Sequence, residues 1–195
     1  MAARIPLVVV IGGPNGAGKS TMAPRLLQGA LTVTEFVNAD TIARGLSAFR
    51  PESVGLAAGR LMMERIKRLA ASRADFAFET TLASRSFAPW LKTLRASSYR
   101  VHLTFLSLPS PELALARVAE RVRLGGHEVP EDIVRRRFAA GLRNFFTLYP
   151  EVVDTWQMFD NSDLARPRLI ASGRTGKPPE ILDAGAWKHL LEKQQ

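Results

Sequence analysis

"LVVVIGGPNGAGKST", residues 7–21, is the stretch that decides the fold. Its apolar, β-forming run, residues 8–11, leads directly into a glycine-rich turn that closes on a lysine and two hydroxyl residues. A short apolar run that ends at glycine is typical of a buried strand in a parallel sheet. We therefore predict a strand over residues 7–11, a helix over residues 18–29, and a functional loop between them.

The loop matches the Walker A pattern, in which Gly13 is followed after four residues by Gly18-Lys19-Ser20. Glycines let successive backbone N–H groups turn inward around an anion, and the positive end of the following helix strengthens this nest. Lys19 is expected to reach the β- and γ-phosphates, and the Ser20 hydroxyl to bind Mg²⁺. We expect ATP and Mg²⁺ as cofactors, with the nucleotide held by Gly13, Pro14, Asn15, Gly16, Ala17, Gly18, Lys19, Ser20 and Thr21.

Apolar runs alternate with longer amphipathic stretches along the rest of the chain, which predicts a parallel sheet covered by helices on both faces. Further strands are expected over residues 35–40, 75–80, 99–108, 155–162 and 168–173. Helices are expected over residues 52–72, 85–97, 111–124 and 131–146, with a last helix from residue 180. Because no internal repeat or linker interrupts this alternation, residues 1–195 are interpreted as a single α/β domain of the P-loop NTPase class.

The composition narrows the class of partner. The 195-residue chain is 46% hydrophobic, has no cysteine and carries a net charge of +9. No apolar run reaches the roughly 20 residues that span a bilayer, and the phosphate loop begins too early for a cleaved signal peptide. We expect a cytoplasmic protein without a membrane partner.

The charge predicts an anionic partner, and nucleic acid is the weaker candidate because no aromatic residues are interleaved with the basic ones for base stacking.

Two acidic residues are expected at the carboxyl ends of strands, where parallel sheets bind their ligands. Asp40 ends the second predicted strand, and Glu79 ends the third. Asp40 is a candidate general base that accepts the proton of an acceptor hydroxyl, or the N-cap of the following helix. Glu79 is a candidate to hold Mg²⁺ through water or to bind the acceptor hydroxyl. The neighbouring Thr80 and Thr81 either hydrogen-bond the substrate or satisfy the strand end.

Of the 27 basic residues, 21 are arginine, and seven of these arginines bunch within residues 117–143. We predict a mobile lid in this region that closes over the donor phosphates and stabilises the charge of the transferred phosphoryl group. Arg121 and Arg136 are the catalytic candidates among its arginines, and His127 at the tip is interpreted as a turn residue. A solvated basic face is the alternative interpretation, and we favour it for Arg123, Arg135 and Arg143.

Five segments, taken in order, resemble the zeta-toxin family of small P-loop kinases, and in particular its compact bacterial branch. They are GGPNGAGKST, FVNADTIA, FETTLASR, RVAERVRLGGHEVPEDIVRRRF with GLRNF, and FDNS, and together they extend from about residue 7 to residue 163. The resemblance implies an adenylate-kinase-like or chloramphenicol-phosphotransferase-like fold with a small arginine-rich lid. It also implies ATP-dependent phosphorylation of a hydroxyl on a UDP-N-acetylsugar, with UDP-N-acetylglucosamine as the leading acceptor.

The resemblance assigns roles to individual residues of this chain. Lys19 and Ser20 match the phosphate loop, and Asp40 matches the general base. Glu79 and Thr81 match the acceptor-binding pair. The best matches to the lid arginines are Arg121 and Arg136, with Arg137 next, while Arg117 and Asn161 lie where such folds hold the adenine. A separate antitoxin protein is a further partner that the family leaves open.

Other P-loop functions leave signatures that this sequence does not contain. An ABC-type ATPase carries an LSGGQ-like motif, and a regulatory GTPase carries N-K-x-D; neither occurs here. Two alternatives stay open. One is a kinase for another acceptor, such as a nucleoside, a small metabolite or a nucleic-acid end. The other is a nucleotide-dependent switch that hydrolyses ATP slowly, which would have no need of a carboxylate such as Asp40 on the acceptor side.

Overall fold

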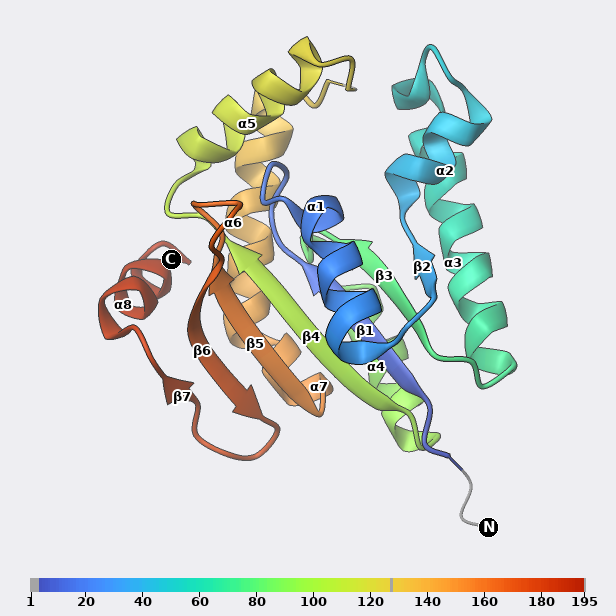
Figure 1. Cartoon of the computed structure of the whole chain (residues 1–195), viewed down its shortest axis with the longest axis vertical. Coiled ribbons are helices and arrows are strands. Elements are labelled where there is room, and N and C mark those ends of the chain that lie inside the picture. The colour runs from blue at the N-terminus through green and yellow to red at the C-terminus, as the bar shows by residue number, and fades with distance from the viewer. Residues whose placement is uncertain (1–3, 127, 195) are drawn as a thin grey trace.

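A computed structural model describes residues 4–126 and 128–194, so His127 lies outside the described residues. These residues form a seven-stranded sheet in the order β2-β3-β1-β4-β5-β6-β7 (Figure 1). The strands are β1 (Leu7–Gly12), β2 (Glu35–Val37), β3 (Phe76–Thr80), β4 (Arg100–Ser107), β5 (Thr155–Asp160), β6 (Arg168–Arg174) and β7 (Glu180–Ile181).

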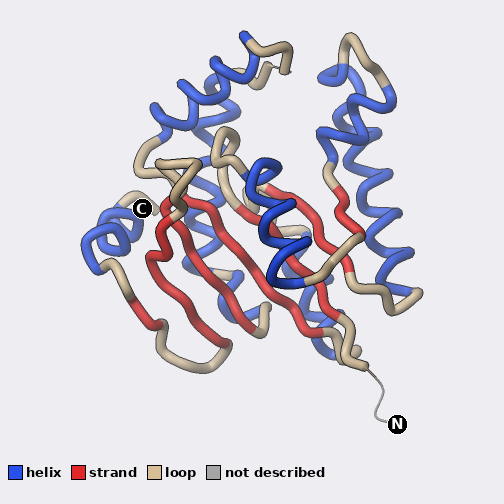
Figure 2. The backbone as a smooth tube through the Cα atoms, in the orientation of Figure 1, coloured by secondary structure: helices blue, strands red, loops and turns tan. Residues whose placement is uncertain are grey.

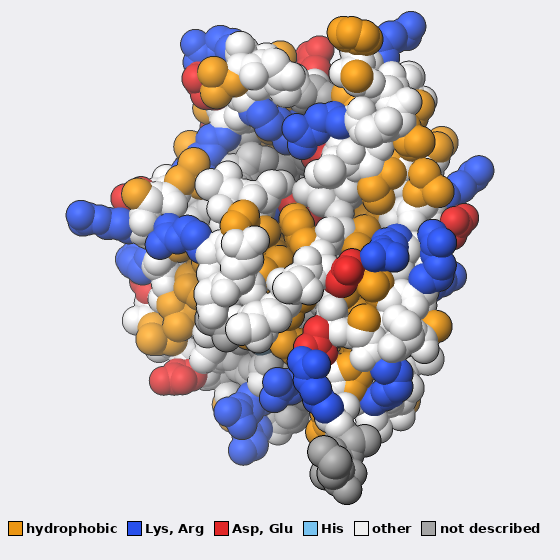
Figure 3. All heavy atoms as spheres, turned by 45° about the vertical axis from the view of Figure 1, so that its right-hand side comes forward, with side chains coloured by type: hydrophobic (Ala, Val, Ile, Leu, Met, Phe, Trp, Pro, Cys, Tyr) orange, Lys and Arg blue, Asp and Glu red, His pale blue; other side chains and the backbone are white. Residues whose placement is uncertain are grey.

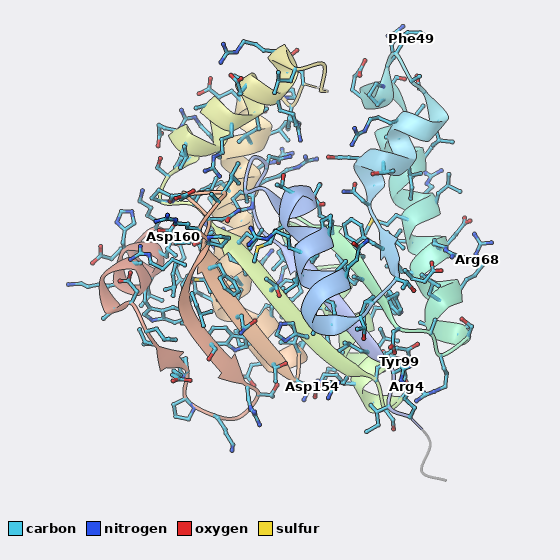
Figure 4. The ribbon with its side chains drawn as sticks, viewed as in Figure 1. Arg4, Phe49, Arg68, Tyr99, Asp154 and Asp160 are labelled. Carbon is cyan, nitrogen blue, oxygen red and sulfur yellow. The ribbon has the colours of Figure 1, made fainter. Side chains whose placement is uncertain are left out.

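The first five strands of the chain pair in parallel, and β6 and β7 add an antiparallel edge. Strand β1 lies between β3 and β4, so the strand order reverses at β1 and a crevice opens at its carboxyl end, as the rule for open α/β sheets requires. Asp160 ends β5 at this edge of the sheet, whereas Asp154 precedes β5 at the opposite edge (Figure 4).

Helices cover both faces of the sheet, which confirms the predicted P-loop α/β class (Figure 2). In Figure 1, α1 lies in front of the sheet, and α4, α6 and α7 lie behind it. The helices are α1 (Lys19–Pro24), η1 (Arg25–Leu31), α2 (Ala39–Leu46), η2 (Pro51–Val54), α3 (Gly55–Ala71), α4 (Phe87–Ala96), α5 (Pro111–Arg123), α6 (Glu131–Thr147), α7 (Tyr149–Val152) and α8 (Ala184–Glu192).

The alternation of β1 side chains builds two cores. Val9 and Ile11 pack on one face with Ala23 and Leu27, which come from α1 and η1. Val8 and Val10 belong to the larger cluster on the other face, to which helices α3 to α6 contribute. All four valine and isoleucine side chains of this run are fully buried, as expected for a parallel strand that is covered on both faces.

Two helical arms rise above the carboxyl edge of the sheet (Figure 1). Helices α2 and α3 form one arm, and helices α5 and α6 form the other. Ser110 caps α5, the first helix of the second arm, by accepting a hydrogen bond from the backbone N–H of Leu113. Phe49 lies at the tip of the α2–α3 arm and is 98% exposed (Figure 4).

Three predicted elements differ from the structure. Strand β2 is three residues long and ends before Asn38, because α2 begins already at Ala39. The first helix passes into a π-helix after Pro24, which has no N–H to donate. Glu180 belongs to the edge strand β7 and not to the last helix. None of the described helices is long and apolar enough to cross a membrane.

Helix α6 holds the loop that follows β3 in place. The Asn144 carboxamide donates to the backbone oxygens of Leu82 and Ala83 at 2.7 and 3.2 Å, and the Tyr149 hydroxyl donates to that of Ser84 at 3.1 Å. Gly141 lets α6 approach this closely, because a Cβ at this position would overlap the carbonyl oxygen of Thr81. The loop after β3, which forms one wall of the crevice, is thus held from behind by α6 and by Tyr149 of α7.

We predict that Gly141→Ala lowers the free energy of unfolding by about 1–3 kcal/mol, the usual cost of overpacking a tight contact. The matched control is Gly59→Ala, which is also within a helix but has no atom within 4 Å of an added Cβ. This control should gain about 0.5–1 kcal/mol from helix propensity. Thermal unfolding of both variants measures the difference, and equal melting temperatures would contradict the close packing of α6.

Candidate functional site

A cleft of about 840 Å³ lies at the carboxyl edge of the sheet, and both arms contribute to its walls. The cleft is lined by the phosphate loop, by the first residues of α2 and by the first residues of the loop after β3. Side chains of α3, α5 and α6 complete the lining. Figure 3 shows basic side chains bordering the hollow between the two arms. The cleft brings together residues 15–21, 38–40, 79–84 and 117–140, which are far apart in the sequence.

The phosphate loop is tightly enclosed by its neighbours. Gly16 has a φ of +76°, and a Cβ there would lie 2.6 Å from the carbonyl oxygen of Ala114. A side chain at this position would therefore push α5 away from the loop. Helix α1 begins after Gly18, as the Walker A pattern predicts, and its first residues are Lys19 and Ser20. The loop is thus shaped both by its own backbone and by the contact with α5.

Lys19 lines the cleft and is deeply buried, since only 6% of its surface is exposed. Its Nζ donates to the Pro14 carbonyl oxygen at 2.8 Å and lies 3.7 Å from Oε1 of Glu79. Burial lowers the pKa of Lys19, and the negative charges of Glu79 and Asp40 oppose that effect. The ammonium group is therefore poised beside two carboxylates at the place where an anionic ligand would be bound.

Ser20, Asn38 and Glu79 form one hydrogen-bonded group next to this lysine. The Ser20 hydroxyl donates to Oε2 of Glu79 at 2.7 Å, and the Asn38 carboxamide donates to the same oxygen at 2.8 Å. The register of β1 and β3, which pairs Gly12 with Thr80, places Glu79 level with the start of the loop. Two hard oxygen groups thus face each other, which is the ligand type that Mg²⁺ prefers.

Asp40 lies in the first turn of α2 and not at the end of a strand. The predicted alternative, that Asp40 caps this helix, is wrong, because the side chain of Asn38 accepts the hydrogen bonds from the first backbone N–H groups. The Asp40 carboxylate lines the cleft, is 42% exposed, and has Oδ2 4.0 Å from Nη1 of Arg121 on the opposite arm. It is therefore accessible to a bound molecule.

The arginines of the α5–α6 arm divide into two groups. Those that line the cleft are Arg117, Arg121, Arg136 and Arg137. The other three make contacts elsewhere: Arg123 pairs with Glu120, Arg135 pairs with Glu112 and Glu131, and Arg143 donates to the Gln194 carbonyl oxygen. This division places Arg121 and Arg136 together in one cavity, and it leaves the three residues that we assigned to a solvated face outside that cavity.

Arg117 and Asn161 fasten the phosphate loop to the loop that follows β5. The Arg117 guanidinium donates to the carbonyl oxygens of Gly16, Asn161 and Ser162 at 3.4, 2.8 and 2.5 Å. The Asn161 carboxamide, which is 1% exposed, donates to the Ala17 carbonyl oxygen at 2.6 Å. Both residues thus join the loop after β5 to the phosphate loop through backbone carbonyl oxygens.

The two predicted threonines have local partners. The Thr80 hydroxyl accepts from the N–H of Leu82 at 3.1 Å, and that of Thr81 accepts from the N–H of Ala83 at 3.4 Å. Both line the cleft, and because each hydroxyl accepts in these bonds, its proton can still be donated to a ligand. The described residues contain no group of three or more His, Cys, Asp or Glu side chains that could hold a metal by itself.

Sequence reasoning missed two asparagines that shape the site. Asn38 lies in the FVNADTIA segment, and its position just before an acidic first helical turn is a usual N-cap signal. Asn144 lies inside a helix, and nothing local marks it as the residue that holds the loop after β3. Its role depends on the packing of α6 and appears only in three dimensions.

A family model described as an AAA domain matches residues 8–148. An uncharacterized protein of Haemophilus influenzae is 32% identical over 126 residues, which make up 65% of this chain and 88% of that protein. The match to the family model includes the phosphate loop, Asp40, Glu79 and all the cleft arginines, while the β5–β6 region lies outside it.

Solved structures share the fold at low identity. The AvrRxo1-ORF1:-ORF2 complex with ATP superposes with a TM-score of 0.76 at 18% identity, over 97% of this chain and 64% of the matched chain. The PezAT toxin–antitoxin system of Streptococcus pneumoniae gives 0.64 at 13%, over 99% and 87%. A putative kinase of Chloroflexus aurantiacus gives 0.56 at 16%, over 69% and 80%. This chain spans less than two thirds of the AvrRxo1 chain.

We predict that Arg117→Ala weakens ATP binding by about 10-fold or more, because hydrogen bonds to charged groups contribute about 1.5–3 kcal/mol. Arg117→Lys should recover little of this, since an ammonium cannot bridge carbonyl groups as the guanidinium fork does. Arg123→Ala on the same helix is the control. If calorimetry gave all three variants the same ATP affinity as the unmodified chain, the hydrogen bonds of Arg117 to the phosphate loop would not contribute to ATP binding.

Proposed function

Because the chain belongs to the AAA_33 family of AAA domains, we propose that it is an ATP-dependent kinase that transfers the γ-phosphate to an alcohol hydroxyl of a small molecule. One observation carries the proposal. A single cleft holds the phosphate loop on one side, an accessible carboxylate, Asp40, on another, and arginines of the α5–α6 arm above them. This is the set of groups that phosphoryl transfer requires.

In the proposed reaction the acceptor oxygen attacks the γ-phosphorus while its proton passes to the Asp40 carboxylate. The new O–P bond forms as the bond between the γ-phosphorus and the β,γ-bridging oxygen breaks, and ADP leaves with that oxygen. Arg121 and Arg136 lie on the cleft wall and stabilise the negative charge on the γ-phosphoryl oxygens. Lys19, already held beside the loop, contacts the β- and γ-phosphates.

The Ser20–Glu79 pair fits Mg²⁺, because both groups offer oxygen atoms and stand 2.7 Å apart beside the phosphate loop. Ser20 would contact the ion directly, and Glu79 would hold it through water. Bound there, the ion neutralises charge on the β- and γ-phosphate oxygens. In this assignment Glu79 serves the metal side of the cleft, and acceptor binding relies on Asp40, Thr80 and Thr81.

The proposed acceptor is a UDP-N-acetylsugar, with UDP-N-acetylglucosamine first. The sequence resemblance supports it. The acceptor side of the cleft combines apolar side chains, Met62 and Phe87, with the charged Arg136 and Arg137. Such a wall suits a ligand that carries both a ring and a diphosphate.

A protein partner is also proposed. AvrRxo1-ORF1 was solved together with AvrRxo1-ORF2, and PezAT is a toxin–antitoxin pair. A separately encoded antitoxin that blocks the cleft would keep this kinase inactive until release. Co-expression with the adjacent reading frames, followed by affinity purification, tests the pairing directly.

We predict that γ-labelled ATP and Mg²⁺ transfer label to UDP-N-acetylglucosamine in preference to nucleosides, free sugars and 5′-hydroxyl RNA. The phosphorylated product is identified by mass spectrometry. Transfer to one of the other acceptors would support the proposed kinase activity but would show that the acceptor is a different molecule. ATP hydrolysis that no acceptor stimulates would instead favour the nucleotide-dependent switch.

Asp40→Asn should lower acceptor phosphorylation by about 10²–10⁴-fold, the usual effect of removing a general base. ATP affinity should change little, because the phosphate loop is untouched, and stability should change little, because Asp40 is half-exposed and Asn38 caps the helix. The control is Glu52→Gln, an exposed acid on the same arm. Equal phosphorylation by both variants would remove Asp40 from the chemistry.

A further inference from the structure

One buried side chain joins the two halves of the cleft. The Asn38 oxygen accepts from the backbone N–H groups of Asp40 and Thr41 at 2.7 and 3.2 Å. Its amide nitrogen donates to Oε2 of Glu79 at 2.8 Å and to the Ser20 hydroxyl at 3.2 Å. Asn38 is 7% exposed, so water does not readily replace these partners. Both ends of the carboxamide are therefore fully used.

The topology explains why this residue reaches both groups. Parallel register pairs Val37 of β2 with Phe78 of β3, so the next residues, Asn38 and Glu79, come level at the carboxyl edge. Asn38 then starts α2, which carries Asp40 two residues later. The side chain thus stands between the start of the acceptor-side helix and the pair that faces the phosphates.

Resting on the kinase function proposed above, we propose that Asn38 is a positioning residue that sets the Glu79–Ser20 pair and the start of the Asp40 helix relative to each other. It touches no reacting atom itself. By donating to Glu79 it orients the carboxylate toward Ser20, and by capping α2 it fixes the first turn, in which Asp40 lies. Loss of the amide nitrogen should weaken the metal side of the cleft, while loss of the oxygen should loosen the acceptor side.

Asparagine is suited to both tasks in a way that the other good N-caps are not. Serine, threonine and aspartate also cap helices well, but a carboxylate has no donor and a hydroxyl has only one proton. An aspartate at this position would in addition place a second negative charge against Glu79. The carboxamide supplies an acceptor for the helix and two N–H donors for its neighbours at the same time.

Asn38→Ser and Asn38→Asp separate the two ends, because both keep an oxygen that can cap α2 and both lose the amide donors. We expect the melting temperature of Asn38→Ser to stay close to that of the unmodified chain, and that of Asn38→Asp to fall because its carboxylate lies against Glu79. Substitutions behind metal ligands usually cost 10–100-fold in metal affinity or activity. The gain in ATP affinity on adding Mg²⁺, measured by calorimetry without an acceptor, should therefore shrink by about 10-fold or more, and ATP binding without Mg²⁺ should stay the same.

The matched control is Asp183→Asn, the reverse exchange at the N-cap of α8, away from the cleft. A second arm combines Asn38→Ser with Glu79→Gln. If Asn38 acts through Glu79, the double variant shows no further loss of the Mg²⁺ effect than Glu79→Gln alone. An undiminished Mg²⁺ effect in Asn38→Ser, or losses that add fully in the double variant, would overturn the proposal. These binding measurements need no acceptor, so their outcome tests the role of Asn38 independently of whether the protein is a kinase.

Discussion

The site depends on the parallel pairing of β1 with β3. This register sets Gly12 opposite Thr80 and therefore brings Glu79 beside the phosphate loop. The pairing of β3 with β2 extends the same edge to Asn38. A slip of one residue would turn Glu79 to the other face of the sheet, where it would meet packed apolar side chains. The fully buried valines of β1 make such a slip very costly, so the core enforces the chemistry.

Buried charge follows from this arrangement. Lys19 cannot avoid desolvation once the loop closes around it, and burial lowers its pKa. Glu79 lies 3.7 Å away and offsets part of that cost, while Ser20 and Asn38 satisfy the carboxylate. A buried cluster of this kind adds little to the free energy of unfolding, because the cost of removing the charges from water offsets most of their attraction. Its value is that the ammonium group is already in place when a polyanionic ligand arrives.

The sequence was sufficient for the fold class, for strands β1 to β6 and for the position of the phosphate loop, because these depend on local patterns. It predicted no range for α2 or α7, and it missed β7. Asp40 was misplaced because the predicted strand was extended to residue 40, whereas β2 stops after three residues and Asn38 caps the helix that follows. The sequence also contains no local sign that the Arg117 guanidinium bonds to carbonyl oxygens of residues over 40 positions away. Contacts of that separation follow from tertiary packing alone, which the local pattern does not encode.

The anchoring of α5 limits how the arm can move. Its middle is held to the phosphate loop by the contact of Ala114 with Gly16 and by the hydrogen bonds of Arg117. Arg121 lies one turn beyond this anchor, and Gly125, with a φ of +84° and no close neighbour, follows the end of the helix. A motion of the arm that preserves these contacts would have to begin beyond Arg117, and it would leave the phosphate loop undisturbed.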